Sequence, residues 1–402
     1  MTENTPPASP ALLKRIKRHI KGRPRDFFIV TAPELTSLCY DELMALHLPL
    51  EQAQMVPGGI EIKGRLTAGY LANLHLRMAN RILMRLDHFH ATNFRQLHKK
   101  LAAFPWEMYL YATSALSFQV TARHSRLYHT DAISEVFRSA VLERLSHRGL
   151  PQGSQPVEGY RQQIFVRTLD DNFSISIDSS GTNLYKRGFK KQGGAAPLRE
   201  TIASAVLTLA GYDGTQILFD PMCGTGTFSF EAAMIAAHIP PGWHRTFAFM
   251  GWPAFSPQQW AFLRKEAQKD IRTIEQPLIF ASDKHRDHCR SLARSIESAG
   301  LSGAINVRCR DFFEVDPLAQ NQKTGLVILN PPYGRRLGTD REANRRIHAI
   351  GAKLLSAFKG WRLALLIPHK NWLQALPFDL KTHPLQHGGL RLLLAVGTIP
   401  EA

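Results

Sequence analysis

The positions of hydrophobic and polar residues predict alternating strands and helices in the first part of the chain. An apolar run at 27–31 predicts a buried strand, and apolar residues at helical spacing predict a helix over 35–46. A Pro-Gly-Gly turn at 57–59 precedes another predicted strand at 60–64. Strands and helices that alternate over so short a length predict a small α+β domain, which we place at 26–90.

The next stretch predicts a second α+β domain, at 91–180. Strand-like runs occur at 118–122, 164–169 and 173–178, and helical spacing predicts a helix over 130–145. A short polar turn separates the last two strands, which predicts that they pair as a hairpin.

The remaining part, 181–402, has the pattern of a doubly wound α/β domain. Four short apolar runs, each typical of a buried parallel strand, end at or just before a polar side chain. These side chains are, in chain order, Asp220, Asp283, Asp311 and Asn330. Open α/β sheets bind ligands at the carboxyl ends of their strands, so we expect these four side chains to share one site.

Composition adds a partner class to this picture. The chain has 402 residues, of which 44% are hydrophobic, enough for the cores of two or three domains. Its net charge of +17 favours a polyanionic partner through phosphate neutralisation, and a protein that is simply basic is the alternative. Residues 1–25 combine a Pro- and Thr-containing start with a block of Lys and Arg. That block predicts a basic disordered tail, which serves either as an RNA-backbone arm or as a solubilising segment.

Other classes of protein are disfavoured. No apolar run approaches the roughly 18 residues of a transmembrane helix, and the first residues lack the apolar core of a secretory signal. The four cysteines (Cys39, Cys223, Cys289 and Cys309) form no CxxC pair and no zinc-binding pattern. We therefore expect a cytoplasmic protein with no membrane partner and no metal.

A glycine-containing loop follows the strand that ends at Asp220. The sequence Asp-Pro-Met-Cys-Gly-Thr-Gly-Thr occupies 220–227 and leads into a predicted helix at 228–237. Glycines allow the backbone to approach a ligand closely, and a helix N-terminus favours a carboxylate. Ser229 stands where a dinucleotide-binding GxGxxG loop needs its third glycine, and no Lys-Ser or Lys-Thr pair follows. The pattern therefore disfavours NAD and excludes a P-loop.

The motif Asn330-Pro331-Pro332-Tyr333 ends the strand predicted at 325–329, because proline cannot donate a ladder hydrogen bond. Asn330 offers an amide oxygen and Pro331 a carbonyl as hydrogen-bond acceptors, and Tyr333 offers an aromatic face. Two acceptors and a stacking surface can hold the exocyclic amine of a planar base. A plain proline-rich turn is the structural alternative.

These two motifs resemble those of S-adenosylmethionine-dependent amino-methyltransferases. The string 330–333 resembles their motif IV, which implies that Asn330, Pro331 and Tyr333 are the catalytic residues. The glycine loop resembles their motif I, which implies S-adenosylmethionine as the cofactor. The motif I residues implied to bind it are Asp220, Pro221, Met222, Cys223, Gly224, Thr225, Gly226 and Thr227.

The same resemblance implies three further cofactor contacts. Asp283 is expected to accept hydrogen bonds from the ribose hydroxyls, and Asp311 is expected to accept one from the adenine amino group. Phe312 is expected to pack on the adenine ring. The strings 185–189 and 196–201 resemble motif X, which lies beside the cofactor.

The amino-terminal half resembles a family of RNA-modifying enzymes. Gly58-Gly59-Ile60 and Asn80-Arg81-Ile82 resemble the first region of THUMP-containing 23S ribosomal RNA guanine-N2 methyltransferases, and 91–180 resembles their THUMP RNA-binding domain. The family's fold implies a C-terminal Rossmann-like class I methyltransferase with a mostly parallel seven-stranded sheet. Ferredoxin-like α+β and THUMP domains are expected to precede it.

The resemblance implies methylation of the exocyclic N2 of a guanine in 23S ribosomal RNA, with the base flipped out and stacked on Tyr333. The inserted segment 239–252 is expected to cover the cofactor or to shape the base pocket. The expected RNA contacts are Arg123 and Arg126 in a polar loop, and Arg335 and Arg336 beside the catalytic motif. For these arginines, an ordinary solvated surface is the alternative.

Other functions stay open. A transfer RNA guanine-N2 methyltransferase keeps the chemistry and changes the substrate. A DNA adenine-N6 methyltransferase and a glutamine methyltransferase of release factors share motif IV. An RNA-binding ribosome assembly factor without activity is the non-enzymatic alternative, and the intact motifs I and IV argue against it.

Overall fold

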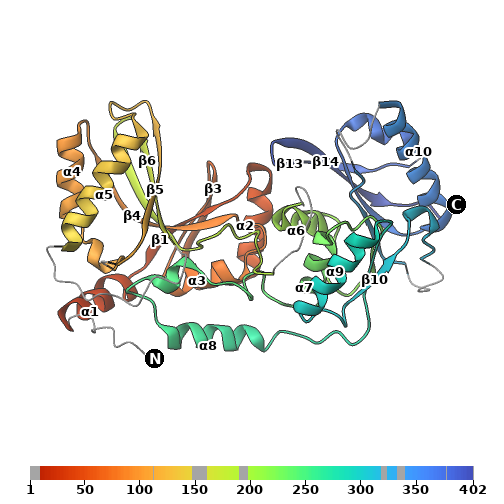
Figure 1. Ribbon diagram of the computed structural model, residues 1–402, viewed down its shortest axis with the longest axis horizontal. Helices are drawn as coiled ribbons and strands as arrows, with labels where there is room; N and C mark the ends of the chain where they lie inside the picture. The colour runs from red at the N-terminus through yellow and green to blue at the C-terminus, as the bar shows by residue number, and fades with distance from the viewer. Residues whose placement is uncertain are drawn as a thin grey trace. The chain divides into compact units, whose positions relative to one another are not determined.

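The computed structural model forms two compact units, each with its own sheet (Figure 1). The first unit comprises the chain up to Leu184 together with Arg245–Lys265, and the second comprises Tyr185–His244 and Glu266–Ala402. The structure describes residues 10–111, 113–146, 161–189, 198–317, 324–332, 340–376 and 378–401.

The first unit contains a sheet of seven strands in the order β2-β3-β1-β4-β7-β6-β5. The strands are β1 (Arg25–Val30), β2 (Leu50–Val56), β3 (Gly59–Gly64), β4 (Arg81–His90), β5 (Leu116–Arg123), β6 (Gln162–Leu169) and β7 (Asn172–Asp178). Strand β4 pairs with β1 on one side and with β7 on the other. The two α+β regions that the sequence predicts as separate domains therefore share one continuous sheet.

The first unit begins with a helix that the sequence did not predict. The helices of this unit are α1 (Pro10–Ile16), α2 (Thr36–Ala45), α3 (Leu66–His75), α4 (Phe94–Ala103), α5 (Thr130–Ser146) and most of α8 (Pro257–Gln268). Helix α1 continues into a π-helical turn at Lys17–Lys21. The predicted disordered tail is therefore wrong for residues 10–25, while residues 1–9 lie outside the described residues.

Apolar side chains hidden between the basic ones explain why this terminus is ordered. Leu12, Ile16 and Ile20 are buried, at helical spacing, in a stretch where the lysines and arginines dominate the composition. Arg15 also donates to Glu107 at 3.1 Å, and Arg144 of α5 holds the same buried carboxylate. This contact with η3 (Trp106–Met108) ties α1 to the rest of the unit.

The segment Arg245–Lys265 packs against the first unit. The ring of Phe249 stacks on Tyr70 of α3, with centroids 4.1 Å apart, and Trp252 Nε1 donates to Gln162 Oε1 at 2.9 Å. Residues 245–252 thus contribute to the core of the first unit, and the prediction that 239–252 covers the cofactor or shapes the base pocket stays a prediction.

The second unit contains a mostly parallel sheet of seven strands in the order β10-β9-β8-β11-β12-β14-β13, which confirms the predicted class. The strands are β8 (Leu218–Asp220), β9 (Ile279–Asp283), β10 (Ile305–Cys309), β11 (Leu326–Leu329), β12 (Arg362–Ile367), β13 (Lys381–His387) and β14 (Leu390–Thr398). Only β14 runs antiparallel to its neighbours β12 and β13 in this described sheet.

Helices pack on both faces of this sheet because its central strands are buried on both sides. They are α6 (Glu200–Leu209), α7 (Thr227–Ala236), α9 (Arg286–Ser298) and α10 (Asp340–Ala357). Ile347, Ile350 and Leu354 of α10 are fully buried in the same core cluster as Val327 of β11 and Leu363 of β12. This core fixes β11, the strand that ends at the predicted catalytic motif.

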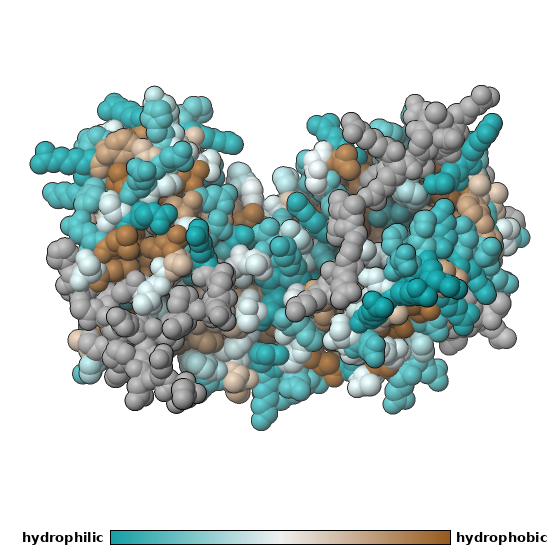
Figure 2. Space-filling model, viewed as in Figure 1, coloured by the Kyte–Doolittle hydropathy of each residue, from teal (hydrophilic) through white to brown (hydrophobic). Residues whose placement is uncertain are grey.

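On the face shown in Figure 2, hydrophilic residues predominate and hydrophobic ones form limited patches. None of the described helices is both long enough and apolar enough to cross a bilayer.

Candidate active site

The polar residues predicted to share a site do follow neighbouring parallel strands. Strand β8 pairs with β9 on one side and with β11 on the other, both in parallel. The strand order therefore reverses at β8 and β11, and such a reversal opens a crevice at the carboxyl ends of the strands. Asp220, Asp283 and Asn330 stand at or just after these ends.

The glycine loop after β8 is held against β9 by hydrogen bonds that two of its backbone N–H groups donate. Cys223 N donates to the Ser282 carbonyl at 3.0 Å, and Gly224 N donates to Asp283 Oδ2 at 3.1 Å. Gly226, with φ of 77°, precedes α7, and a Cβ on it would overlap the side chain of Leu292 on α9. Gly224, with φ of 53°, has open space where a Cβ would stand. The loop is thus rigid on one side and open to a ligand on the other.

Asp220 holds this loop from inside the protein. Its side chain is buried, and Oδ2 accepts a hydrogen bond from Ser229 Oγ of α7 at 2.7 Å. Burial raises the pKa of Asp220 to about 7, and the neighbouring Asp283 adds to the rise. In the sequence, Ser229 served only to disfavour NAD, because a serine in the first turn of a helix does not indicate a hydrogen bond to a buried carboxylate.

The raised pKa predicts a loss of stability with increasing pH. The native protein binds the Asp220 proton more tightly than the unfolded chain, so stability falls as pH rises from about 4 through about 7. We expect the free energy of unfolding of the wild type to fall by about 2–3 kcal/mol more than that of Asp220→Asn between pH 5 and 8. Urea unfolding of both proteins at a series of pH values measures this, and parallel profiles would contradict it.

Asp283 organises the turn after β9. Its Oδ1 accepts from His285 N at 2.8 Å and lies 3.4 Å from His288 Nδ1, while Oδ2 accepts from Gly224 N. The carboxylate is 13% exposed, so it keeps an accessible side. Asp283 therefore joins the glycine loop to the N-terminus of α9, and its free lone pairs fit the predicted role of accepting from ribose hydroxyls.

Replacing Asp283 with asparagine is expected to weaken S-adenosylmethionine binding about 10- to 100-fold, because a hydrogen bond to a charged acceptor contributes about 1.5–3 kcal/mol. Isothermal titration of the purified variant measures this affinity. Asp287→Asn, on the exposed side of α9, removes a carboxylate of the same helix and serves as the control. Equal affinities of the two variants would reject the role of Asp283.

The structure gives Phe312 a different surrounding from the one predicted. Asp311 Oδ1 accepts from Phe313 N at 3.0 Å and caps the turn η5 (Phe312–Glu314), and Arg310 N donates to the Asp283 carbonyl at 3.1 Å. The ring of Phe312 is buried in the core, stacked on Phe358. Phe313 is 43% exposed, so its ring is the more accessible one for a ligand. The sequence alone does not show which of these two adjacent phenylalanines is buried in the core and which is accessible to a ligand.

Asn330 carries a buried acceptor without a donor. Its Oδ1 is buried and has no hydrogen-bond partner in the described structure. Leaving such an atom unpaired costs about 1–3 kcal/mol, which marks a place where a ligand's N–H group would be bound. Pro331 is buried beside it and Pro332 is exposed. Tyr333, Arg335 and Arg336 lie outside the described residues.

The predicted RNA-contact residues Arg123 and Arg126 are in the first unit, at the end of β5 and just beyond it. Arg126 is 75% exposed, and its backbone N donates to Asp171 Oδ1 at 2.7 Å. Ser125 Oγ contacts Thr168 Oγ1 at 3.0 Å, which further fixes this loop on the β6–β7 hairpin. The loop is thus an ordered, exposed, basic surface, and its contact with RNA stays a prediction.

A buried ion pair supports α7, and sequence reasoning missed it. Arg187 Nε donates to Glu231 Oε1 at 2.8 Å, and Ser204 Oγ of α6 donates to Glu231 Oε2 at 2.5 Å. Arg187 belongs to the string that resembles motif X, while Pro197 and Ala196 of its second part lie outside the described residues. The pair fixes the segment before α6 against the helix whose N-terminus carries the glycine loop.

The donor set fits S-adenosylmethionine. The open space at Gly224, the partly exposed carboxylate of Asp283 and the unpaired Oδ1 of Asn330 all follow adjacent strand ends. The His, Cys, Asp and Glu side chains for which the structure gives positions form no group of three or more that could hold a metal ion.

Family models match two parts of the chain. Residues 187–381 match the RMKL-like methyltransferase domain, and residues 26–83 match the RlmL ferredoxin-like domain. Both matches agree with the predicted fold of each region.

Relatives match nearly the whole chain. "Putative RNA methyltransferase slr0064" of Synechocystis sp. (strain ATCC 27184 / PCC 6803 / Kazusa) is 28% identical over 91% of this chain and 94% of that protein. Ribosomal RNA large subunit methyltransferase K/L of Syntrophotalea carbinolica is 32% identical over 84% of this chain and 48% of that protein. The chain thus spans about half the length of the K/L relatives that it matches.

A solved structure also matches over most of both chains. "Crystal structure of SMU.472, a putative methyltransferase complexed with SAH" matches with a TM-score of 0.81 and 27% identity, and the match covers 93% of this chain and 98% of that one. SAH, S-adenosylhomocysteine, is what remains of S-adenosylmethionine after methyl transfer. This chain therefore has the fold of a methyltransferase whose crystal structure contains that product.

Proposed function

This chain joins an RlmL-type ferredoxin-like domain to an RMKL-like methyltransferase domain, and we propose that it methylates the exocyclic N2 of a guanine in large-subunit ribosomal RNA. S-adenosylmethionine supplies the methyl group, which is bound to its positively charged sulfonium sulfur. The observation that carries the proposal is the buried, unpaired Oδ1 of Asn330 at the end of β11.

Asn330 and Pro331 would hold the amine of the base. The lone pair of a guanine N2 is delocalised into the ring, so the free amine is a weak nucleophile. Its two N–H groups would donate to Asn330 Oδ1 and to the Pro331 carbonyl, which localises the lone pair on nitrogen and points it away from the two acceptors. Most of the rate enhancement then comes from positioning and electrostatics, and no strong base is needed.

The glycine loop and Asp283 would hold the cofactor beside this amine. Gly224 leaves room for close approach, and the N-terminus of α7 favours a carboxylate. Asp283 would accept from ribose hydroxyls while its bond to Gly224 N keeps the loop in place. Asp220, bonded to Ser229, keeps the end of β8 fixed to α7.

Two observations support RNA as the substrate. The net charge of +17 suits a polyanion, and the ordered loop with Arg123 and Arg126 offers exposed cations to phosphates. The names of the relatives include RNA methyltransferase and ribosomal RNA large subunit methyltransferase. We propose ribosomal RNA ahead of transfer RNA because the K/L relatives are named for the large subunit. We also propose a cytoplasmic location, which suits four free cysteines.

A labelling experiment tests the proposal. The purified protein is incubated with tritiated S-adenosylmethionine and with ribosomal RNA, transfer RNA or DNA from a strain that lacks the gene, and the labelled nucleoside is then identified. N2-methylguanosine in large-subunit RNA is the expected result. Label in transfer RNA would replace the substrate, and label in DNA adenine, or none at all, would overturn the proposal.

A further inference from the structure

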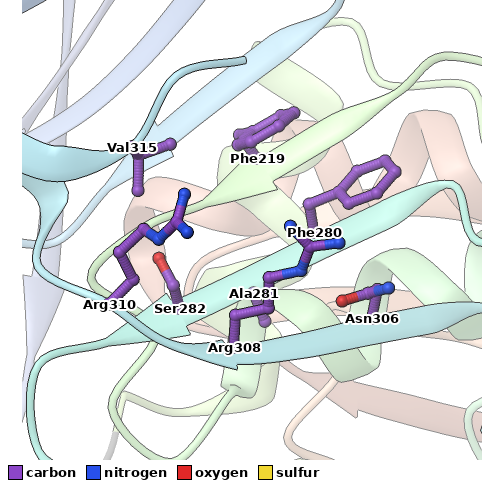
Figure 3. A pocket seen from close by; sticks show the side chains of 8 residues that line it. All are labelled: Phe219, Phe280, Ala281, Ser282, Asn306, Arg308, Arg310 and Val315. Atoms are coloured by element: carbon purple, nitrogen blue, oxygen red, sulfur yellow. The ribbon is translucent and has the colours of Figure 1, made fainter. Parts of the chain in front are cut away.

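A pocket lies in the methyltransferase unit, beside the strand ends that carry Asp220, Asp283 and Asp311 (Figure 3). It opens on the sheet face that α10 also covers, because Phe219 belongs to the α10 core cluster and Phe280 packs against it. It lies over β9 and β10, beside that core. The residues that line it are Phe219, Phe280, Ala281, Ser282, Asn306, Arg308, Arg310 and Val315.

Strand register explains why polar and aromatic side chains meet here. Asn306 pairs with Phe280, and Arg308 pairs with Ser282, in the parallel ladder of β9 and β10. Side chains two residues apart on a strand share a face, so Phe280 and Ser282 lie beside Asn306 and Arg308. Figure 3 shows these side chains together with Arg310, which follows the end of β10.

The floor of the pocket is aromatic. Phe219 and Phe280 stack with ring centroids 5.1 Å apart and planes 19° from parallel. Phe219 is buried, whereas Phe280 is partly exposed. The ring of Phe280 therefore leaves part of its surface to a planar group that stacks on it.

The rim of the pocket carries two arginines without acidic partners. Arg308 and Arg310 are both exposed, and neither guanidinium forms an ion pair with a residue that the structure describes. The buried Arg187 and the largely buried Arg81 do bind carboxylates, of Glu231 and Asp178, whereas the exposed Arg391 also forms no ion pair with a described residue. Two guanidinium groups two residues apart repel each other, and an anionic ligand such as a phosphate would relieve that repulsion.

We propose that this pocket binds a nucleotide of the RNA substrate, with the base stacked on Phe280 and its phosphates held by Arg308 and Arg310. The inference rests on the proposed function, and it assigns a second contact with the same RNA strand. The pocket adjoins the predicted cofactor residues, but the side chains of Phe280, Asn306 and Arg308 lie on the face of the sheet. Asp283 is instead the last residue of β9, and Asp311 follows the end of β10.

The double variant Arg308→Gln/Arg310→Gln tests the phosphate contacts. Loss of two phosphate contacts is expected to weaken RNA binding about tenfold or more and to reduce the slope of log K against log salt by about 1.4. The KM for RNA should rise by a similar factor, with kcat and S-adenosylmethionine affinity unchanged. The control is Arg391→Gln, an exposed arginine of β14 in the same unit.

Phe280→Leu tests the stacking contact while keeping an apolar side chain in the core. We expect about tenfold weaker RNA binding without a change in the salt slope. Normal cofactor affinity of this variant verifies that the unit is folded. Competition with free guanosine monophosphate distinguishes a nucleotide within the RNA from a free nucleotide. If the pocket binds a nucleotide within the RNA, guanosine monophosphate at concentrations near the Kd for RNA should not displace the RNA.

The outcomes separate this inference from the proposed function. If the wild type fails to methylate RNA in the labelling experiment, the proposed function falls. If the wild type methylates RNA but the double variant matches Arg391→Gln in RNA affinity, salt slope and KM, the pocket does not contact RNA. The inference would likewise be overturned if free guanosine monophosphate binds the protein in the absence of RNA while the variants keep the wild-type affinity for RNA.

Discussion

Asn330→Ala is expected to lower kcat about 100- to 1000-fold while the affinities for S-adenosylmethionine and RNA stay within about twofold of the wild type. The side chain supplies one of the two acceptors that would localise the lone pair of the amine, and that interaction strengthens as the methyl group is transferred. Its loss therefore affects the transition state more than the bound ground state. Single-turnover methyl transfer, with enzyme in excess over RNA, measures the chemical step directly.

A conservative variant sharpens this prediction. Asn330→Asp keeps an acceptor oxygen at the same place, so it should retain more activity than Asn330→Ala. If alanine leaves the rate of single turnover near that of the wild type, the orphaned Oδ1 of Asn330 has no role in catalysis, and the mechanism proposed here is wrong. Equal losses in both variants would show that the NH2 group of the amide matters instead.

Glu231→Ala is expected to destabilise the methyltransferase unit by about 3–5 kcal/mol. The variant leaves the guanidinium of Arg187 buried without its carboxylate, and it also removes the acceptor of Ser204. Desolvated charge without a partner costs far more than the same charge in water. Guanidinium chloride unfolding, followed by tryptophan fluorescence, measures the loss as a shift of the midpoint at unchanged slope.

The double variant Arg187→Met/Glu231→Leu provides the matched control. It removes both charges and fills the space with apolar side chains, so it should recover most of the stability that Glu231→Ala loses. If the single and double variants are equally unstable, the loss comes from packing around α7 rather than from the unpaired charge. Intact stability of Glu231→Ala would mean that the buried pair has no structural role.

The catalytic half could be predicted well because its information is local. A buried parallel strand needs a continuous apolar run, and the residue after it stands at the functional edge of the sheet. Asp220, Asp283 and Asn330 could therefore be placed at the ends of neighbouring strands from the sequence alone, and the structure confirms that placement. The loop at 220–227 was equally clear, since only glycine at 226 suits both its positive φ and the close approach of Leu292.

The long-range contacts could not be predicted in this way. The burial of Ile16 and Ile20 depends on surfaces far along the chain, so the surrounding lysines and arginines dominated the pattern and indicated disorder. The choice between Phe312 and Phe313 depends on which ring faces Phe358. The pairing of Arg187 with Glu231 likewise joins residues whose spacing carries no periodic signal.

The segment Arg245–Lys265 has a consequence for folding during synthesis. The chain leaves the first unit after Leu184, returns to it at Arg245 and leaves again after Lys265. Phe249, whose ring stacks on Tyr70, is therefore translated about 10–40 s after Tyr70, at roughly 5–20 residues per second. The amino-terminal unit thus emerges from the ribosome with part of its aromatic core still exposed. The core of this unit is complete only after the first third of the methyltransferase unit has also emerged.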